Sequence, residues 1–260
     1  MLVRYRHPRR LFQLAYTWGH SIDNQSDPFA GDFFNLDFTR PAAADTPATT
    51  AFTRQFDSRA DRGNSDFDQR QNLVFYSIWQ TPASERLHGL LRGWTFAQVA
   101  AFRSGLPYSV LAPSSVTLQG GVILNNRADL VPAGGAAGGA VAVAGGERLL
   151  NPAAFAEAAA GTVGNTGRNA FRGPGFYSLD ASLSRTFAAA WLGEAGRLTV
   201  RADAFNFLNH ANLNSPDSTL GSATFGIGLY GRDGRQSGFP ALVPFHETAR
   251  QVQLILRIDF

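Results

Sequence analysis

A run of carboxylate and amide side chains is the part of the sequence best suited to bind a metal ion. Calcium takes six to eight oxygen ligands, and the run supplies Asp57, Asp61, Asn64, Asp66 and Asp68. The spacing lacks the glycine at position six and the glutamate at position twelve of an EF-hand loop. Hydrogen bonds from such side chains to a loop backbone explain the same residues, so we favour a hydrogen-bonded loop over a calcium site.

No other residues stand at a spacing typical of catalysis or metal binding. The chain has no Cys, and a nucleophile elbow, a phosphate-binding loop and a dinucleotide fingerprint are all absent. The glycines of 161–175 precede no predicted helix, so we predict turns there. The five histidines are scattered along the chain: His7, His20, His88, His210 and His246. We therefore predict a protein without catalytic activity, cofactor or metal.

Arginine supplies all 23 basic side chains, yet the net charge is only +3. So small a surplus argues against a protein that coats nucleic acid. We predict instead that arginines on the polar faces of strands form a lattice of ion pairs with strand aspartates. The arginines in question are Arg168, Arg172, Arg201 and Arg257, and the aspartates are Asp180, Asp203 and Asp259.

The elements that would position these residues are strands, because apolar and polar residues alternate with a period of two. The alternation is clearest over 251–260 and recurs at 11–24, 176–187 and 197–208. Two runs at about 70–80 and 93–104 are apolar on both faces, and residues 1–6 complete a set of seven strands. No helical period of similar length occurs, which predicts an all-β fold.

Short and long connections alternate strictly between these strands. A tight turn is predicted at His7–Arg10, whereas the long connections cover about 25–69, 106–175 and 209–249. Within the second, the Gly/Ala run 133–146 buries too little side-chain area to offset its ordering entropy, so we expect it to be mobile. Three long stretches without regular structure are unusual in a compact domain. Membrane β-barrels have short turns at one rim and long loops at the other.

Strand length and aromatic placement fit the same interpretation. Tyr177 to Phe187 is ten steps, or about 33 Å, which spans about 25 Å when the strand is tilted. Aromatic rings favour membrane interfaces, and alternation predicts a girdle with Phe12, Trp79, Trp94 and Phe187 at the inner rim and Trp18 and Tyr177 at the outer rim. Arg185 falls on the lipid-facing parity near a strand end, where its side chain can reach the interface.

Several motifs resemble one known family. They are the segments 16–24 (YTWGHSIDN), 61–70 (DRGNSDFDQR), 161–169 (GTVGNTGRN), 172–176 (RGPGF), 179–180 (LD) and 201–210 (RADAFNFLNH). In this order they resemble the C-terminal barrel of the Oar-like TonB-dependent outer-membrane transporters, over essentially all of residues 1–260. One departure is Ala128, where such proteins tend to carry Pro.

The resemblance implies an up-and-down transmembrane β-barrel segment with long extracellular loops in the outer membrane, and energy-coupled transport of a bulky solute. Implied partners are outer-membrane lipid, the barrel-assembly machinery and the TonB energy-coupling system, which would act through an N-terminal part. Such barrels have about 22 strands, so we expect the seven strands to be part of a larger barrel, without the family's signal peptide, plug and accessory domain. The terminal strand resembles the assembly signal of outer-membrane barrels: Val252, Leu254, Leu256, Ile258 and Phe260.

One alternative shares the same strands and loops. A secreted, soluble β-sandwich that binds glycans or serves in adhesion would also alternate apolar and polar residues and lack catalytic motifs. Cell fractionation separates the two hypotheses, because recovery in the soluble fraction without a gel shift between boiled and unboiled samples would contradict the barrel.

Overall fold

The computed structural model describes residues 1–24, 58–82, 92–112, 116–118, 121–123, 126–231 and 249–260. Its regular structure is strand apart from four short 3-10 helices, Ser58–Asp61, Pro132–Gly134, Pro152–Ala154 and Ala190–Leu192. No helix among these residues is long and apolar enough to cross a membrane. The prediction of an all-β chain is confirmed.

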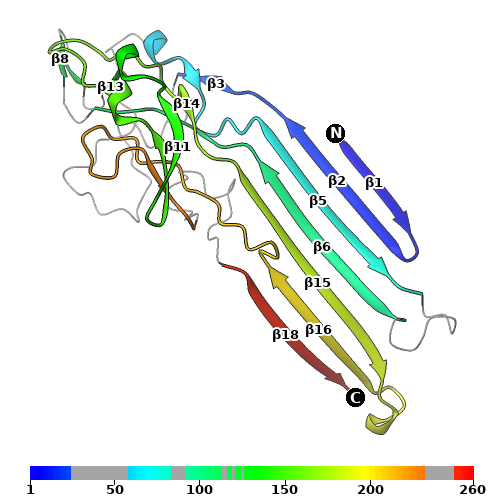
Figure 1. Cartoon of the computed structure of the whole chain (residues 1–260). Coiled ribbons are helices and arrows are strands. Elements are labelled where there is room, and N and C mark those ends of the chain that lie inside the picture. The colour runs from blue at the N-terminus through cyan, green and yellow to red at the C-terminus, as the bar shows by residue number, and fades with distance from the viewer. Residues whose placement is uncertain (25–57, 83–91, 113–115, 119–120, 124–125, 232–248) are drawn as a thin grey trace.

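One long antiparallel sheet dominates the molecule (Figure 1). Its strand order is β1-β2-β5-β6-β15-β16-β18, so neighbours in the sheet follow one another along the chain. The bounds are β1 Leu2–His7, β2 Arg10–Trp18, β5 Gln71–Gln80, β6 Trp94–Arg103, β15 Phe176–Ala188, β16 Arg197–Phe205 and β18 Gln251–Asp259. These are the seven strands that the alternation predicts.

The predicted strand ends differ from the observed ends where the chain leaves the sheet. The strand predicted over 11–24 ends at Trp18, and the one predicted over 197–208 ends at Phe205. Asn206 and Asn209 adopt positive φ values of 48° and 52°. A left-handed residue interrupts the extended backbone. The strand therefore ends at Phe205, although the alternation in the sequence continues for a few more residues.

The pairing register assigns every strand residue to one of two faces, because directly opposed residues lie on the same side of a sheet. Leu183 of β15 stands opposite Phe96 of β6, and Phe96 stands opposite Trp79 of β5. The register therefore orients the two strands whose sequences are apolar on both faces. The odd-numbered residues of β5 and the even-numbered residues of β6 share the apolar face of β15.

The described parts of the long connections gather at one end of the sheet in a cap of small sheets (Figure 1). The cap pairs β3 Ile22–Asp23 with β4 Gly63–Asn64, β7 Pro107–Tyr108 with β14 Phe171–Arg172, β8 Val116–Leu118 with β9 Gly121–Ile123, and β10 Asp129–Leu130 with β13 Phe155–Ala156. A three-stranded sheet joins β11 Gly138–Val143, β12 Gly146–Leu150 and β17 Ile227–Leu229. The premise that these connections lack regular structure was wrong.

The Gly/Ala run 133–146, which the sequence predicted to lack regular structure, contains a strand. Its second half forms strand β11, which pairs with β12, and β12 pairs in turn with β17. Gly145, in the turn between β11 and β12, has a φ of 73°, which glycine adopts without strain. Small side chains contribute little burial here, but the backbone hydrogen bonds of a hairpin are independent of side-chain size.

The buried apolar cluster lies in the cap rather than on the long sheet. Phe155 packs edge-on against Phe171 and Phe225, with ring centroids 5.4 and 5.7 Å apart. The other buried members of the cluster are Val110, Ala128, Leu150 and Ala154. Hydrophobic burial therefore holds the cap together, while the long sheet keeps large apolar side chains exposed.

The long sheet is open. Strands β1 and β18 are its two edges, and every neighbouring pair between them is antiparallel. Seven antiparallel strands in succession leave both edge strands running in the same direction, as their arrowheads show in Figure 1.

Candidate functional site

The first candidate site is the apolar face of the long sheet. Large side chains stand exposed along β18, including Leu254 at 79% and Leu256 at 64% of full exposure. Across β16 they face Ala202 and Val200, and across β15 the face continues with Leu183. Exposed apolar surface of this extent is typical of a face that contacts a partner or a membrane.

The predicted girdle residues all lie on this apolar face. Trp79, Trp94 and Phe187 stand close to the short-turn end, and Phe12 stands opposite Ser77, two residues inward from Trp79. At the cap end, Tyr177 pairs with Phe102, and Trp18 pairs with Gln71. The placement is compatible with two aromatic belts, and the girdle itself stays a prediction.

The residues of the predicted assembly signal lie along one edge of the sheet. Val252, Leu254, Leu256 and Ile258 of β18 point to the apolar face opposite Ala204, Ala202, Val200 and Leu198 of β16. Phe260 follows β18 at the short-turn end and is 92% exposed. Its role in assembly stays a prediction.

Arginines on the apolar face stack on aromatic rings. The guanidinium carbon of Arg10 lies 5.5 Å from the centroid of the Trp79 ring. That of Arg185 lies 5.7 Å from the Trp94 ring and 4.5 Å from the Phe187 ring. These distances are those of cation–π contacts, so the ring faces partly offset the cost of a charge on this face.

The opposite face carries short-range ion pairs within single strands. Arg201 Nε lies 2.7 Å from Asp203 Oδ1, and Arg257 Nη2 lies 2.8 Å from Asp259 Oδ1. The third predicted aspartate, Asp180, accepts a hydrogen bond from the backbone N–H of Asn206. Two of the four arginines therefore form ion pairs with the predicted aspartates, each within its own strand.

For Arg168 and Arg172 the predicted partners were wrong. Both residues lie beyond the long strands, in the cap, where the strand aspartates are out of reach. Arg168 bonds to Asp23 at 2.6 Å and to Asp66 at 3.2 Å, and Arg172 bonds to Asp68 at 2.7 Å.

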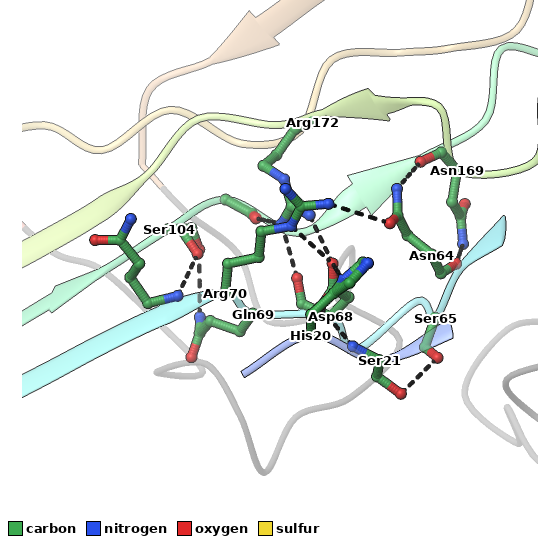
Figure 2. A network of polar contacts seen from close by, with 12 residues as sticks. His20, Ser21, Asn64, Ser65, Asp68, Gln69, Arg70, Ser104, Asn169 and Arg172 are labelled. Carbon is green, nitrogen blue, oxygen red and sulfur yellow. Dashed lines mark hydrogen bonds and ion pairs between the residues drawn. The ribbon is translucent and has the colours of Figure 1, made fainter. Parts of the chain in front are cut away.

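The second candidate site is a polar network centred on Asp68 (Figure 2). The side chain of Asp68 is only 1% exposed. It accepts bonds from Arg172 Nη2 at 2.7 Å and from the backbone N–H of Ser21 at 2.9 Å, and its Oδ2 lies 3.2 Å from His20 Nδ1. Arg172 Nη1 also donates to the backbone carbonyls of Asp68 and Gly105. One carboxylate thus ties both ends of the connection between β2 and β5 to the connection between β6 and β15.

The electrostatics of Asp68 follow from these bonds. Burial by itself raises the pKa of this carboxyl, but the bonds from Ser21, Arg172 and His20 outweigh burial and hold the pKa below its ordinary value. Asp68 is therefore an ionised anchor for the surrounding N–H donors rather than a proton carrier at neutral pH.

A pair of asparagines extends the network. Asn64 Nδ2 donates to the backbone carbonyl of Asn169, and Asn169 Nδ2 donates to that of Asn64, at 2.8 and 2.7 Å. Asn169 also donates to Asp66, which Arg168 contacts as well. Asn169 has a φ of 51°, a conformation that asparagine tolerates better than most residues.

A separate ion pair in the cap, between Arg127 and Asp61, is almost fully buried. Arg127 Nη1 lies 2.7 Å from Asp61 Oδ1, with side-chain exposures of 9% and 6%. Gly164 passes directly over Arg127, since an added Cβ would come within 1.8 Å of the Arg127 carbonyl oxygen. At this position the predicted glycine turn serves a close approach of two backbones.

The aspartates of the calcium hypothesis have protein partners where the structure describes them. Asp61, Asp66 and Asp68 are each bonded to an arginine, and Asp57 lies outside the described ranges. Among the described residues no cluster of three or more His, Cys, Asp or Glu side chains can hold a metal ion. His88 and His246 also lie outside those ranges.

The protein thus contains an open antiparallel sheet with an exposed apolar face, short turns at one end and a polar cap at the other. Comparison with known proteins decides its family. A family model described as an outer membrane beta barrel domain matches residues 4–253. The chain belongs to this family. It is therefore a protein of the outer membrane.

Other comparisons add nothing to this assignment. Neither the curated proteins nor the solved structures give a significant match to the barrel domain. The soluble β-sandwich alternative does not fit the structure, because the small sheets gather at one end of the long sheet and leave its apolar face uncovered by described residues (Figure 1).

Sequence reasoning missed how the cap of the barrel domain is connected. It found the aspartates of 57–68 and the arginines of 161–175 as separate motifs and paired neither with the other. A weak signal was present, since both segments combine charge with glycine and asparagine next to a strand. Matching them requires contacts across about a hundred residues, which local periodicity does not contain.

Proposed function

We propose that the barrel domain forms part of the wall of a TonB-dependent transporter of the Oar-like type, which moves a bulky solute across the outer membrane. In this proposal the apolar face contacts lipid, the polar face lines the lumen, and the cap lies outside the cell. The domain performs no catalysis. The observation that carries the proposal is the Asp68 network, because it unites four of the six motifs on which the family resemblance rests.

Four of the six motifs supply the two sides of these cap contacts. His20 and Ser21 come from the first motif, Asp68 from the second, and Arg172 from the fourth. The third motif supplies Arg168 and Asn169, which contact Asp66 of the second. Motifs that fold into one network support common ancestry with this family more strongly than the same motifs would if they were scattered over the surface.

The open edges support a barrel larger than seven strands. Because β1 and β18 run in the same direction, joining them directly would place two parallel strands side by side. A barrel that is antiparallel throughout needs an odd number of further strands between them. Hydrocarbon makes an unpaired strand edge costly, since each unsatisfied backbone group costs several kcal/mol.

Fractionation of cells that express the gene from its own locus tests the membrane part of the proposal. We expect the protein in the outer membrane, resistant to urea extraction and with a shift on SDS gels between unheated and heated samples. Recovery in the soluble fraction would overturn the proposal.

Energy coupling needs a separate test. Site-directed crosslinking in cells between the intact gene product and TonB should give an adduct that grows when solute-rich medium replaces minimal medium. An outer-membrane protein without any adduct would retain the barrel but lose the transporter assignment.

A further inference from the structure

Charge on the apolar face is confined to one end. Among the described strand residues, the basic side chains on this face are His7, Arg10 and Arg185, and all three lie near the short turns. No described Asp or Glu of the long strands shares the face with them. Toward the cap the same face carries only uncharged residues such as Trp18, Tyr177 and Val252.

Two of these cations occupy equivalent positions. Arg10 of β2 is the direct cross-strand neighbour of Trp79 in β5, and Arg185 of β15 is that of Trp94 in β6. In both pairs the guanidinium lies over the indole ring, at 5.5 and 5.7 Å. The same arrangement thus occurs twice, with the two tryptophans on adjacent strands.

The Trp79 ring is held in place by a hydrogen bond within the sheet. Trp79 Nε1 donates to Ser77 Oγ at 2.8 Å, and Gln98 Nε2 donates to the same oxygen at 3.1 Å. Ser77 is fully buried. Because the indole N–H points inward to Ser77, the Trp79 ring offers Arg10 a fixed surface near the rim.

The chemistry of the stack indicates an anion. A guanidinium stacks through its flat face, while its N–H donors lie in its plane and match the oxygens of a phosphate. A charge on a lipid-facing strand is least costly near the interface, which is where lipid headgroups lie. Within the described residues Arg10 forms no ion pair of its own.

We propose that Arg10 with Trp79 and Arg185 with Trp94 form two binding sites for the phosphate headgroups of anionic glycerophospholipids, in the leaflet at the short-turn rim. This inference rests on the proposed membrane placement of the apolar face. The tryptophan of each site packs beside the upper acyl chain, and the arginine contacts the phosphate.

Tryptophan quenching by brominated lipids tests the two sites. The intact gene product is purified from outer membranes with Trp18, Trp191 and any tryptophan outside residues 1–260 replaced by Phe, so that only Trp79 and Trp94 fluoresce. It is reconstituted in phosphatidylcholine vesicles that contain increasing fractions of brominated phosphatidylglycerol or brominated phosphatidylcholine. We expect the apparent affinity for phosphatidylglycerol to be higher by about fivefold for each arginine.

Variants assign the selectivity to the two arginines. In the double variant Arg10→Gln/Arg185→Gln, both brominated lipids should quench the tryptophan fluorescence equally. The gel shift on heating confirms that this variant folds. Arg6→Gln is the matched control, because Arg6 lies at the same rim on the opposite face, and it should keep the selectivity of the unsubstituted protein.

The outcomes separate the inference from the proposed function. Equal quenching of the unsubstituted protein by both lipids would overturn the headgroup sites and leave the membrane placement intact. No quenching by either lipid would overturn both. If the double variant fails to fold, the unsubstituted protein still decides, because phosphate binding requires a selectivity that falls as salt is raised.

Discussion

The carboxylate of Asp68 and the guanidinium of Arg172 meet at 2.7 Å across 104 residues of sequence. Asp68 lies just before β5, and Arg172 ends β14. The bond joins the connection before β5 to the connection before β15. It is the shortest of the contacts that the Asp68 carboxylate makes with Arg172, Ser21, His20 and Arg70.

Removing the charge of Asp68 should loosen the cap. Asp68→Asn keeps the shape but leaves Arg172 without its carboxylate. We expect the free energy of cap opening to fall by about 2 kcal/mol, less than for a fully buried pair because Arg172 is 28% exposed. Hydrogen exchange of the amides near Ser21 and Gly105 measures the loss. Asp259→Asn is the control, since its pair with Arg257 is exposed, and it should leave exchange unchanged.

Acid should open the cap as well. The folded pKa of Asp68 is lowered, so its stabilisation is complete above the ordinary pKa of about 4 and is lost as pH falls through the lowered value. Proteolysis between about pH 7 and pH 2.5, with an acid-tolerant protease at the low end, should show cleavage rising below about pH 4. Asp68→Asn should flatten this rise, while the share that belongs to Asp217, whose pKa is also lowered, should remain. A rise of equal size in the variant would contradict the assignment to Asp68.

The buried pair of Arg127 and Asp61 should be more sensitive to substitution. Arg127→Met removes the guanidinium from beside the Asp61 side chain, which is 6% exposed, and should cost about 3–5 kcal/mol of cap stability. Adding Asp61→Asn to Arg127→Met should recover part of this loss, because the stranded charge is then gone. A double variant that is less stable than the single one would show that the pair does not act through charge.

The two faces of β18 should respond differently to the same substitution. Leu254→Arg places a charge near the middle of the apolar face and should cost about 2–4 kcal/mol in a bilayer. Gln253→Arg places it on the opposite face, beside Asp203 in the register, and should be nearly neutral. Urea unfolding of the protein reconstituted in vesicles compares them. Equal losses would contradict the lipid-facing assignment.

Deletion of Phe260 tests the assembly signal. Without the terminal aromatic residue we expect the amount of protein in the outer membrane to fall several-fold, because the assembly machinery no longer recognises the last strand. Immunoblots of membrane fractions measure the amount. Gln253→Ala, on the opposite face of the same strand, serves as control. Unchanged outer-membrane levels after the deletion would remove the role of Phe260.

The sequence by itself determined the seven long strands, the turn after His7 and the apolar face of the C-terminal strand. Alternation and turn residues are local properties, so they could be read without knowledge of distant contacts. It did not determine the face of β5 and β6, since both of their faces are apolar. Only pairing with β15, through Leu183 and Phe96, decided it.

Only the tertiary structure decided how the connections fold and which residues form ion pairs with their charged side chains. Arg168 and Arg172 looked like strand arginines with strand partners, yet they bond to aspartates about a hundred residues earlier. The long sheet is specified by a repeating local pattern, and a pattern can be recognised one strand at a time. The cap is specified by single complementary contacts between separate segments, and such a contact exists only once the chain has brought both segments together.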